Sequence, residues 1–135
     1  MSIHGSRLDD DLLGMFSPTE SRIYFDLRLT PIERRSVIAH ELGHAYYGHE
    51  CDNRANERQA NIYAARLLIE PEAYARAEVL SSNAHDIADE LGVLEILVST
   101  YREHCLHRVG DTTYTDSRMG AGQWLHRFET APAHA

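Results

Sequence analysis

The stretch IAHELGHAYYGH, residues 38–49, decides how the fold and the chemistry of this chain are interpreted. Each residue of a helix advances by about 100°, so His40 and His44 lie one above the other on one face. Two imidazoles in that arrangement can bind a single metal ion, and zinc is the ion that this pattern typically holds. Glu41 lies beside the pair, too far round the helix to be a third ligand, but placed to accept a proton from water. The spacing therefore predicts a zinc site with a general base next to it.

Signals on either side of this stretch predict that it forms a helix. Residues 30–33, Thr-Pro-Ile-Glu, are a capping box with proline at the first helical position, so the helix is expected to begin there. Gly48 is typical of a residue that ends a helix, so the last helical residue is expected near Tyr47. Periodicity and the positions of proline and glycine predict further helices at residues 54–70, 72–80, 84–91, 94–108 and 122–128.

The segment before this helix predicts a strand. In RIYFDLRL, residues 22–29, apolar and polar residues alternate, which is typical of a half-buried strand. DLLGMF, residues 11–16, precedes it across the turn residues SPTES, so a hairpin is expected. The predicted fold class is α+β, mostly helical, with a small antiparallel sheet at the N-terminus, and the length of 135 residues predicts a single domain, residues 1–135. The expected apolar face of the second strand consists of Ile23, Phe25, Leu27 and Leu29, against Tyr24, Asp26 and Arg28.

Glu57 is the third ligand that helix geometry favours. If the first helix ends at Gly48 and the next begins near Arg54, then His44 and Glu57 each lie about one turn from the connection and can face each other. Glu57 also shares a face with apolar residues of its own helix, where a carboxylate is costly unless it is paired or binds a metal. The alternative interpretation is a first-turn glutamate that only interacts with the helix dipole.

Other possible ligands near the connection are less well placed. His49 lies one position away from the third histidine of the metzincin pattern, and on a continuing helix it would point away from His40. It is therefore interpreted as a loop or surface histidine. Glu50 and Asp52 remain alternative ligands, whereas Glu70 lies too far along the second helix.

The ligand set also predicts the kind of site. Two histidines and one carboxylate leave one zinc position open to water, which is typical of catalytic rather than structural sites. Cys51 could complete a structural site, but a single cysteine beside a helix end is more often an inert small residue. Cys51 and Cys105 are expected to be free thiols, and a single bridge between them stays an alternative.

Composition limits the partners and the location of the protein. The formal net charge is −8, which argues against non-specific binding to nucleic acid or to an anionic membrane. No apolar run is long enough to span a bilayer, and the N-terminus lacks the features of a signal peptide. A cytoplasmic protein is therefore expected.

Two segments of the chain together resemble the ImmA/IrrE family of zinc metallopeptidases. They are ERRSVIAHELGHAYYGH, residues 33–49, and ERQANIYAARLLIEP, residues 57–71. The family pairs an H-E-L-G-H helix with a second helix of the form E-x-x-A-N-x-[FY]-A-x-x-L-L-x-x-P, and the second segment matches every position of that pattern. The resemblance covers residues 11–108 and does not place residues 110–135.

This resemblance implies both residue roles and a biological role. In a zincin-like metallopeptidase domain of this family, His40, His44 and Glu57 would bind zinc and Glu41 would be the catalytic base. Family members encoded on phages and integrative elements are anti-repressors that cleave a helix-turn-helix repressor, so the implied partner is a protein substrate of that kind in the cytoplasm of a bacterial host. The alternative is a zinc-bound regulator that inactivates the repressor by binding without proteolysis, because such a protein would carry the same residues.

A third class of function, direct DNA binding, is suggested by one segment only. Residues 87–104, IADELGVLEILVSTYREH, have the spacing of a helix-turn-helix DNA reader. The second of its helices carries more acidic than basic residues, which suits packing or substrate recognition better than contact with phosphates. We therefore expect no direct binding of nucleic acid.

The sequence does not identify the residue that stabilises the oxyanion of a peptidase transition state. Tyr47 shares the ligand face and is one candidate. The strand at residues 22–29 is expected to hold substrate as an added strand if it forms an edge of the sheet. The other candidates for oxyanion stabilisation are Tyr101, His104, His107, Tyr114 and His126.

Overall fold

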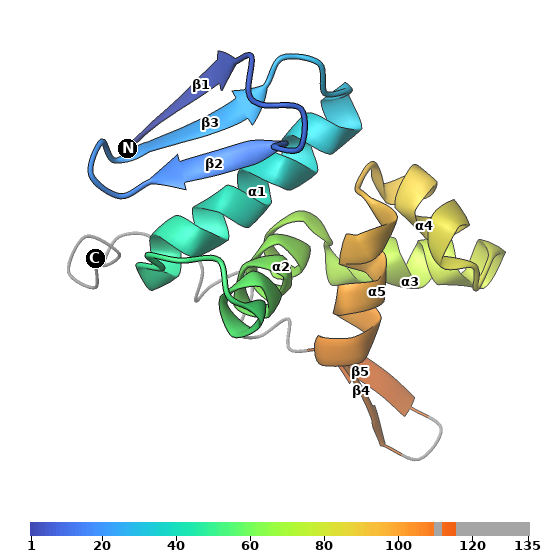
Figure 1. The fold of residues 1–135 in the computed structure, drawn as a ribbon. Coiled ribbons are helices and arrows are strands. Elements are labelled where there is room, and N and C mark those ends of the chain that lie inside the picture. The colour runs from blue at the N-terminus through green and yellow to red at the C-terminus, as the bar shows by residue number, and fades with distance from the viewer. Residues whose placement is uncertain (110–111, 116–135) are drawn as a thin grey trace.

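The computed structural model describes residues 1–109 and 112–115, and the side chains of residues 1–106. Three short strands come first, five helices follow, and a two-stranded hairpin ends the described part of the chain (Figure 1). This arrangement confirms the predicted α+β class with a mostly helical chain. In chain order the elements are β1 (Ser2–Ser6), β2 (Gly14–Ser17), β3 (Arg22–Asp26), α1 (Pro31–Tyr47), α2 (Arg54–Leu68), α3 (Pro71–Leu80), α4 (Ala84–Leu91), α5 (Glu95–His104), β4 (Leu106–Val109) and β5 (Thr112–Thr115).

The N-terminal sheet is mixed, whereas the sequence predicted an antiparallel one. Its strand order is β1-β3-β2, in which β2 and β3 form the predicted antiparallel hairpin and β1 pairs with β3 in parallel. Strand β1 was not predicted because SIHGS has no apolar alternation, and most of its residues are exposed. It joins the sheet through backbone hydrogen bonds, which leave no trace in the pattern of side chains.

The alternation in β3 is only partly what the sequence predicted. Ile23 and Leu29 are buried, but Leu27 is 54% exposed and Asp26 is buried. The reason is that β3 ends at Asp26, so period two no longer applies to the residues that follow. The Asp26 carboxylate accepts hydrogen bonds from the backbone N–H groups of Leu8 and Arg28 and from the Arg28 guanidinium, which makes its burial possible.

Helix α1 begins and ends as predicted. The Thr30 hydroxyl accepts from the Glu33 N–H and the Glu33 carboxylate accepts from the Thr30 N–H, so both bonds of the capping box are present. Gly48 adopts the left-handed conformation, with φ of 67°, directly after the last helical residue. The three-stranded sheet covers one side of α1 and α2 packs against another (Figure 1), which makes α1 the central element of this half of the molecule.

Helices α3, α4 and α5 form a second group beside α2 (Figure 1). Helices α4 and α5 have the helix-turn-helix order expected from residues 87–104, with Ala88, Val93 and Val98 buried and Gly92 in the left-handed conformation between them. The helix predicted at 94–108 ends at His104, because residues 106–109 pair with residues 112–115 as a hairpin. A Gly-Asp pair at positions 110–111 is a common turn signal that the helical interpretation overlooked. The predicted helix at 122–128 lies outside the described residues.

Two further expectations concern cysteines and membrane spans. Cys51 is exposed and has a free thiol, so it makes no bridge to Cys105, which is buried. Among the described residues, no helix is both long enough and apolar enough to cross a bilayer. That the whole chain, residues 1–135, forms one domain stays a prediction.

Candidate metal centre

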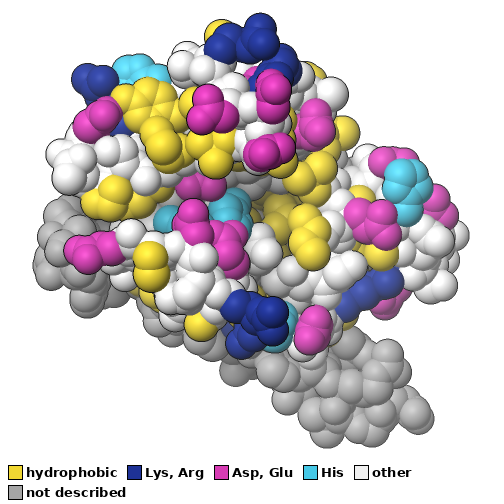
Figure 2. Space-filling view, viewed as in Figure 1, with side chains coloured by type: hydrophobic (Ala, Val, Ile, Leu, Met, Phe, Trp, Pro, Cys, Tyr) yellow, Lys and Arg dark blue, Asp and Glu magenta, His cyan; other side chains and the backbone are white. Residues whose placement is uncertain are grey.

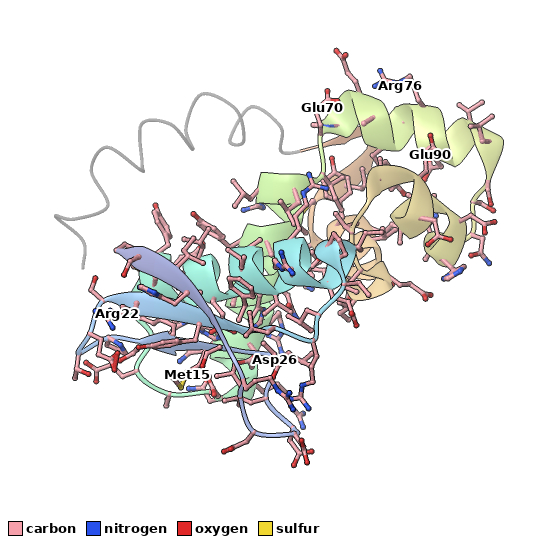
Figure 3. All side chains as sticks on the ribbon, turned by 90° about the horizontal axis from the view of Figure 1, so that it is seen from above. Met15, Arg22, Asp26, Glu70, Arg76 and Glu90 are labelled. Carbon is pink, nitrogen blue, oxygen red and sulfur yellow. The ribbon has the colours of Figure 1, made fainter. Side chains whose placement is uncertain are left out.

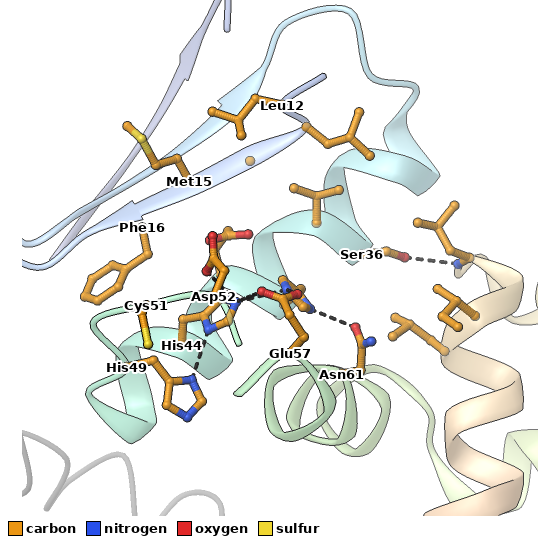
Figure 4. Close-up of a pocket in the computed structure, with 18 of the residues that line it drawn as sticks. Leu12, Met15, Phe16, Ser36, His44, His49, Cys51, Asp52, Glu57 and Asn61 are labelled. Atoms are coloured by element: carbon orange, nitrogen blue, oxygen red, sulfur yellow. Dashed lines mark hydrogen bonds and ion pairs between the residues drawn. The ribbon is translucent and has the colours of Figure 1, made fainter. Parts of the chain in front are cut away.

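Three predicted ligand side chains converge between α1 and α2. The Nε2 atoms of His40 and His44 lie 3.1 Å apart, and each faces one carboxylate oxygen of Glu57, at 2.8 Å and 3.0 Å respectively (Figure 4). One ligand atom from each residue lies within 4.8 Å of the others. His40, His44 and Glu57 are hereafter called the triad.

The close approach of two helices brings the triad together. His40 and His44 are on successive turns of α1, and Glu57 is in the first turn of α2. Gly43 lies in α1 between His40 and His44 and packs against Ala60 of α2. A Cβ atom added at Gly43 would be 2.9 Å from the Ala60 Cα. Only glycine permits the backbones to approach this closely, and this approach allows the short side chain of a glutamate to reach both imidazoles.

The side of each imidazole that faces away from Glu57 has a hydrogen-bond partner. His40 Nδ1 lies 2.8 Å from the Asn61 Oδ1, which can only accept, so His40 Nδ1 carries the proton. His44 Nδ1 lies 3.0 Å from His49 Nδ1, and His49 Nε2 lies 2.7 Å from the Gln59 Oε1. Since Gln59 Oε1 accepts, His49 Nε2 donates, and the neutral His49 ring then offers Nδ1 as an acceptor for the proton on His44 Nδ1.

The direction of these hydrogen bonds determines which nitrogen of each imidazole carries the proton. These partners select the tautomer with the proton on Nδ1, and in that neutral tautomer both Nε2 atoms present lone pairs to each other and to the Glu57 carboxylate. Burial, followed by the neighbouring His40 imidazole, lowers the pKa of His44, which favours its neutral form. Several lone pairs with no proton between them repel one another unless a cation lies among them. Two imidazole nitrogens and a carboxylate are a ligand set that fits a divalent transition metal.

Glu41 is a buried carboxylate next to the triad in sequence and in space. Its side chain lines the same cavity as His40 and His44 and accepts a hydrogen bond from the backbone N–H of Phe16 in β2. Burial, with the negative charges of Glu57 and Asp52, raises the pKa of Glu41 to about 8. A carboxylate in these surroundings binds protons readily, as a general base must.

The cavity has one polar and one apolar side. Its volume is about 470 Å³, and it lies between β2, α1, the α1–α2 loop and the start of α5. Figure 2 shows histidine at the bottom of a hollow, with acidic and apolar side chains around it. Such a combination suits a peptide, which presents both a polar backbone and apolar side chains. The apolar side consists of Leu12, Leu13, Val37, Leu94, Ile96 and Leu97.

A comparison with protein families agrees with this geometry. The sequence model of the Peptidase_M78 family, described as the IrrE N-terminal-like domain, matches residues 2–100. The chain belongs to this family. The Peptidase_M78 match confirms the resemblance to ImmA/IrrE proteins, although it starts at residue 2 rather than 11 and ends at 100 rather than 108. No curated protein and no solved structure matches the chain.

Membership of the Peptidase_M78 family supports a peptidase-type function with a protein substrate. The match includes all three strands of the N-terminal sheet, both helices that carry the triad, and the walls of the cavity. The segments that follow, including β4 and β5, lie outside it.

The alternative ligands occupy other positions in this Peptidase_M78 domain. Asp52 Oδ1 is 3.9 Å from His44 Nε2 and its side chain is 83% exposed, so it lies near the triad without joining it. Glu50 and Cys51 line the cavity but are not part of the triad. Glu70 caps the N-terminus of α3, on the opposite side of the view from Met15 of β2 (Figure 3).

Among the candidates for oxyanion stabilisation, none with a described side chain lines the cavity. Tyr47 is 36% exposed, and its ring stacks on that of His49 at 5.5 Å. Tyr101 is buried in α5 and His104 lies at the end of the same helix. The side chains of His107, Tyr114 and His126 are outside the described part of the chain. A role for Tyr47 in stabilising the transition state stays a prediction.

The sequence interpretation missed the hydrogen-bond partners of the histidines. Asn61 lies four residues after Glu57, on the same face of α2, and that spacing could have linked it to the site. The sequence predicts a loop or surface histidine at position 49, and His49 does lie in the loop, but it is half-buried against His44. Gln59 is exposed, and only its contact with His49 reveals its connection to the site.

Proposed function

We propose that this chain is a zinc-dependent metallo-endopeptidase, with His40, His44 and Glu57 as metal ligands and Glu41 as the general base. The observation that supports it most directly is the convergence of two imidazole nitrogens and a carboxylate at the wall of a peptide-sized cavity. Zinc is the proposed metal because three protein ligands of this type, with one position left for water, are typical of catalytic zinc sites.

The proposed reaction divides the chemistry between the ion and the chain. When bound, zinc supplies Lewis-acid chemistry, which polarises a carbonyl group and makes water more acidic. The Glu41 carboxylate removes the proton from the attacking water and later donates it to the leaving amine. Burial keeps Glu41 away from bulk solvent, so the proton that it holds is passed to the leaving group in the cavity.

Strand β2 is the element to which an extended substrate can add. The sequence interpretation favoured β3 for this role if it formed an edge, but β3 is the central strand of the sheet. Strand β2 is at an edge, and Gly14, Met15 and Phe16 line the cavity (Figure 4). Backbone hydrogen bonds to an edge strand hold a peptide extended, as peptidase substrates must be held.

The proposed substrate is a helix-turn-helix repressor, and the proposed location is the bacterial cytoplasm. This part of the proposal rests on the ImmA/IrrE resemblance. The net charge of −8 accords with a protein that acts on a DNA-binding partner rather than on DNA itself.

The variant Glu41→Gln tests the proposal because it separates metal binding from chemistry. Glutamine is nearly isosteric, so the three ligands stay in place and zinc stays bound. Cleavage of the repressor should fall by roughly 10²–10⁴-fold, the usual effect of losing a positioned general base. Zinc content and cleavage are measured side by side for the parent and the variant.

Two outcomes of this experiment would change the interpretation. Undiminished cleavage by the variant would remove Glu41 from its proposed role. If the parent relieves repression without ever cutting the repressor, and the variant does so equally well, the protein is a binding-only regulator.

A further inference from the structure

The C-terminal end of α1 holds His49 against His44 through two separate hydrogen bonds. In addition to the contact between their Nδ1 atoms, the backbone N–H of His49 donates to the backbone carbonyl of His44 at 3.0 Å. The N–H of Gly48 donates to the carbonyl of Ala45 at 3.2 Å. These two backbone bonds, with Gly48 left-handed between them, make up a Schellman motif.

The Schellman motif explains why a histidine at this position reaches the triad. The motif folds the second residue after the helix back over the residue five positions earlier, and an apolar contact usually joins the two side chains. Here the pair is His49 and His44, and a hydrogen bond between imidazoles takes the place of the apolar contact. The helix end therefore places an acceptor opposite the Nδ1 of a candidate metal ligand.

The hydrogen bonds continue beyond His49 to a second helix. The His49 Nε2 donates to the Gln59 Oε1 at 2.7 Å, so a continuous chain of hydrogen bonds runs from His44 on α1 to Gln59 on α2. Gln59 can only accept at that oxygen, and this selects the His49 tautomer whose Nδ1 accepts from His44. The same two helices carry the triad, so this chain of bonds also joins them across the α1–α2 loop.

We propose that His49 is a positioning residue of the metal centre: it holds the His44 ring with Nε2 unprotonated and directed at the metal, and Gln59 maintains His49 in the tautomer that does so. This inference rests on the proposed function, because it presupposes that His44 binds the ion. Partners of this kind orient a ligating histidine and raise its basicity, and their loss typically lowers metal affinity by about 10–100-fold.

The competing explanation is that the His49 ring only fills space. It stacks on the ring of Tyr47 at 5.5 Å with an interplanar angle of 16°, so a purely structural role is physically reasonable. Two substitutions separate these roles. His49→Phe keeps a ring for stacking and removes the acceptor, whereas His49→Asn removes the ring and keeps an acceptor oxygen near the place of Nδ1.

The experiment measures the zinc dissociation constant of the full chain by competition with a chromophoric chelator. We expect His49→Phe to weaken zinc binding by about 10–100-fold and His49→Asn to stay within about threefold of the parent. Cobalt-substituted protein should show altered visible absorption bands for His49→Phe only, since these bands report the geometry of the ligands. His85→Phe is the matched control, because His85 is exposed on α4 and does not line the cavity.

A second pair of variants tests the far end of the hydrogen-bond chain and does not depend on whether His49→Phe folds. Gln59 is exposed, so its replacement leaves the packing of α2 unchanged. Gln59→Leu should weaken zinc binding by about tenfold, whereas Gln59→Glu, which keeps an acceptor, should retain the parent affinity. In the double variant His49→Phe/Gln59→Leu the losses should not add, because the second residue acts only through the first.

Each result either supports the inference or overturns it. If His49→Phe binds zinc as tightly as the parent, or His49→Asn binds as weakly as His49→Phe, His49 is a packing residue. Equal affinities of Gln59→Leu and the parent would overturn the role of Gln59. A parent protein that binds no zinc would instead refute the proposed function, which keeps the two failures distinguishable.

Discussion

Glu57 reaches both histidine nitrogens with its two carboxylate oxygens, and no other acidic side chain among the described residues does so. Glu57→Ala should therefore weaken zinc binding by more than about a hundredfold, since loss of a ligand costs more than loss of an outer partner. Glu50→Ala and Asp52→Ala should leave the affinity unchanged, because neither residue belongs to the triad. Chelator competition on the three variants provides the measurement. A large effect of Asp52→Ala instead would place the third ligand in the α1–α2 loop.

Asp26 is the other carboxylate whose surroundings allow a residue-scale prediction. Its side chain is 2% exposed, and the Arg28 guanidinium, followed by the Arg28 and Leu8 backbone N–H groups, lowers the pKa of Asp26 far below its usual range. Its charged form therefore stabilises the fold above the pKa of the unfolded chain, about 3.9, and that contribution is lost as the pH falls toward the lowered folded-state pKa.

Asp26→Asn should accordingly lower the urea midpoint of unfolding at pH 7. The difference between parent and variant should shrink below about pH 4, because the Asp26 carboxylate of the unfolded parent then takes up a proton while that of the folded protein keeps its charge. Asp10→Asn is the control, because Asp10 contacts the same guanidinium at 3.2 Å with a side chain that is 96% exposed, and such surface pairs contribute little. A difference that stays constant from pH 7 to pH 3 would contradict this account.

At the scale of elements, the contact between α1 and α2 at Gly43 determines how far Glu57 lies from His40 and His44. A methyl group at this position would meet the Cα and carbonyl oxygen of Ala60 at 2.9 Å and 3.0 Å, and these are backbone atoms that cannot rotate away. Gly43→Ala should lower the unfolding free energy of the metal-free protein by about 1–3 kcal/mol, the usual cost of overpacking. It should also weaken zinc binding, because the helices must separate and carry Glu57 away from the histidines.

Gly92→Ala is the control for this prediction. Gly92 ends α4 with φ of 68°, so alanine there is also destabilising, but Gly92 does not line the cavity. The control should lower the temperature of unfolding and leave the zinc dissociation constant unchanged. Equal zinc affinity in Gly43→Ala and the parent would mean that the helix spacing does not limit the geometry of the site.

At the scale of the whole molecule, zinc binding should stabilise the folded chain. A ligand that binds only the folded state adds about 2.7 kcal/mol when its free concentration is a hundred times its dissociation constant. For a domain of this size we expect the midpoint of thermal unfolding to rise by roughly 10 °C on titration of metal-free protein with zinc. His44→Ala should abolish the rise and His85→Ala should preserve it. Unchanged unfolding of the parent in saturating zinc would contradict the proposed centre.

The parts of the fold that were predictable carry local signals. The capping box that starts at Thr30 and Gly48 at the other end predict the bounds of helix α1. Both signals involve only residues that are close in sequence. The helical period and a short connection are enough to bring His40, His44 and Glu57 together, so the sequence alone predicts the triad.

The parts that were missed depend on contacts between distant segments. Strand β1 pairs with β3 through backbone groups, and its sequence alone gives no reason to expect this. Leu27 followed the alternating pattern yet is exposed, because β3 had already ended. The prediction that His49 points away from the site assumes a helix that continues past Gly48. The left-handed conformation of Gly48 instead reverses the chain and places His49 next to His44.

The triad and its hydrogen-bond partners belong to a single helical hairpin, residues 40–61, and this has a consequence for the order of folding. Contacts across a short connection cost little loop entropy, so α1 and α2 can pair early, whereas the parallel pairing of β1 with β3 must enclose the intervening strand first. Interactions that are already formed in the transition state change the rate of folding. Zinc is therefore expected to accelerate refolding, rather than only to slow unfolding, because its ligands meet before the sheet is complete.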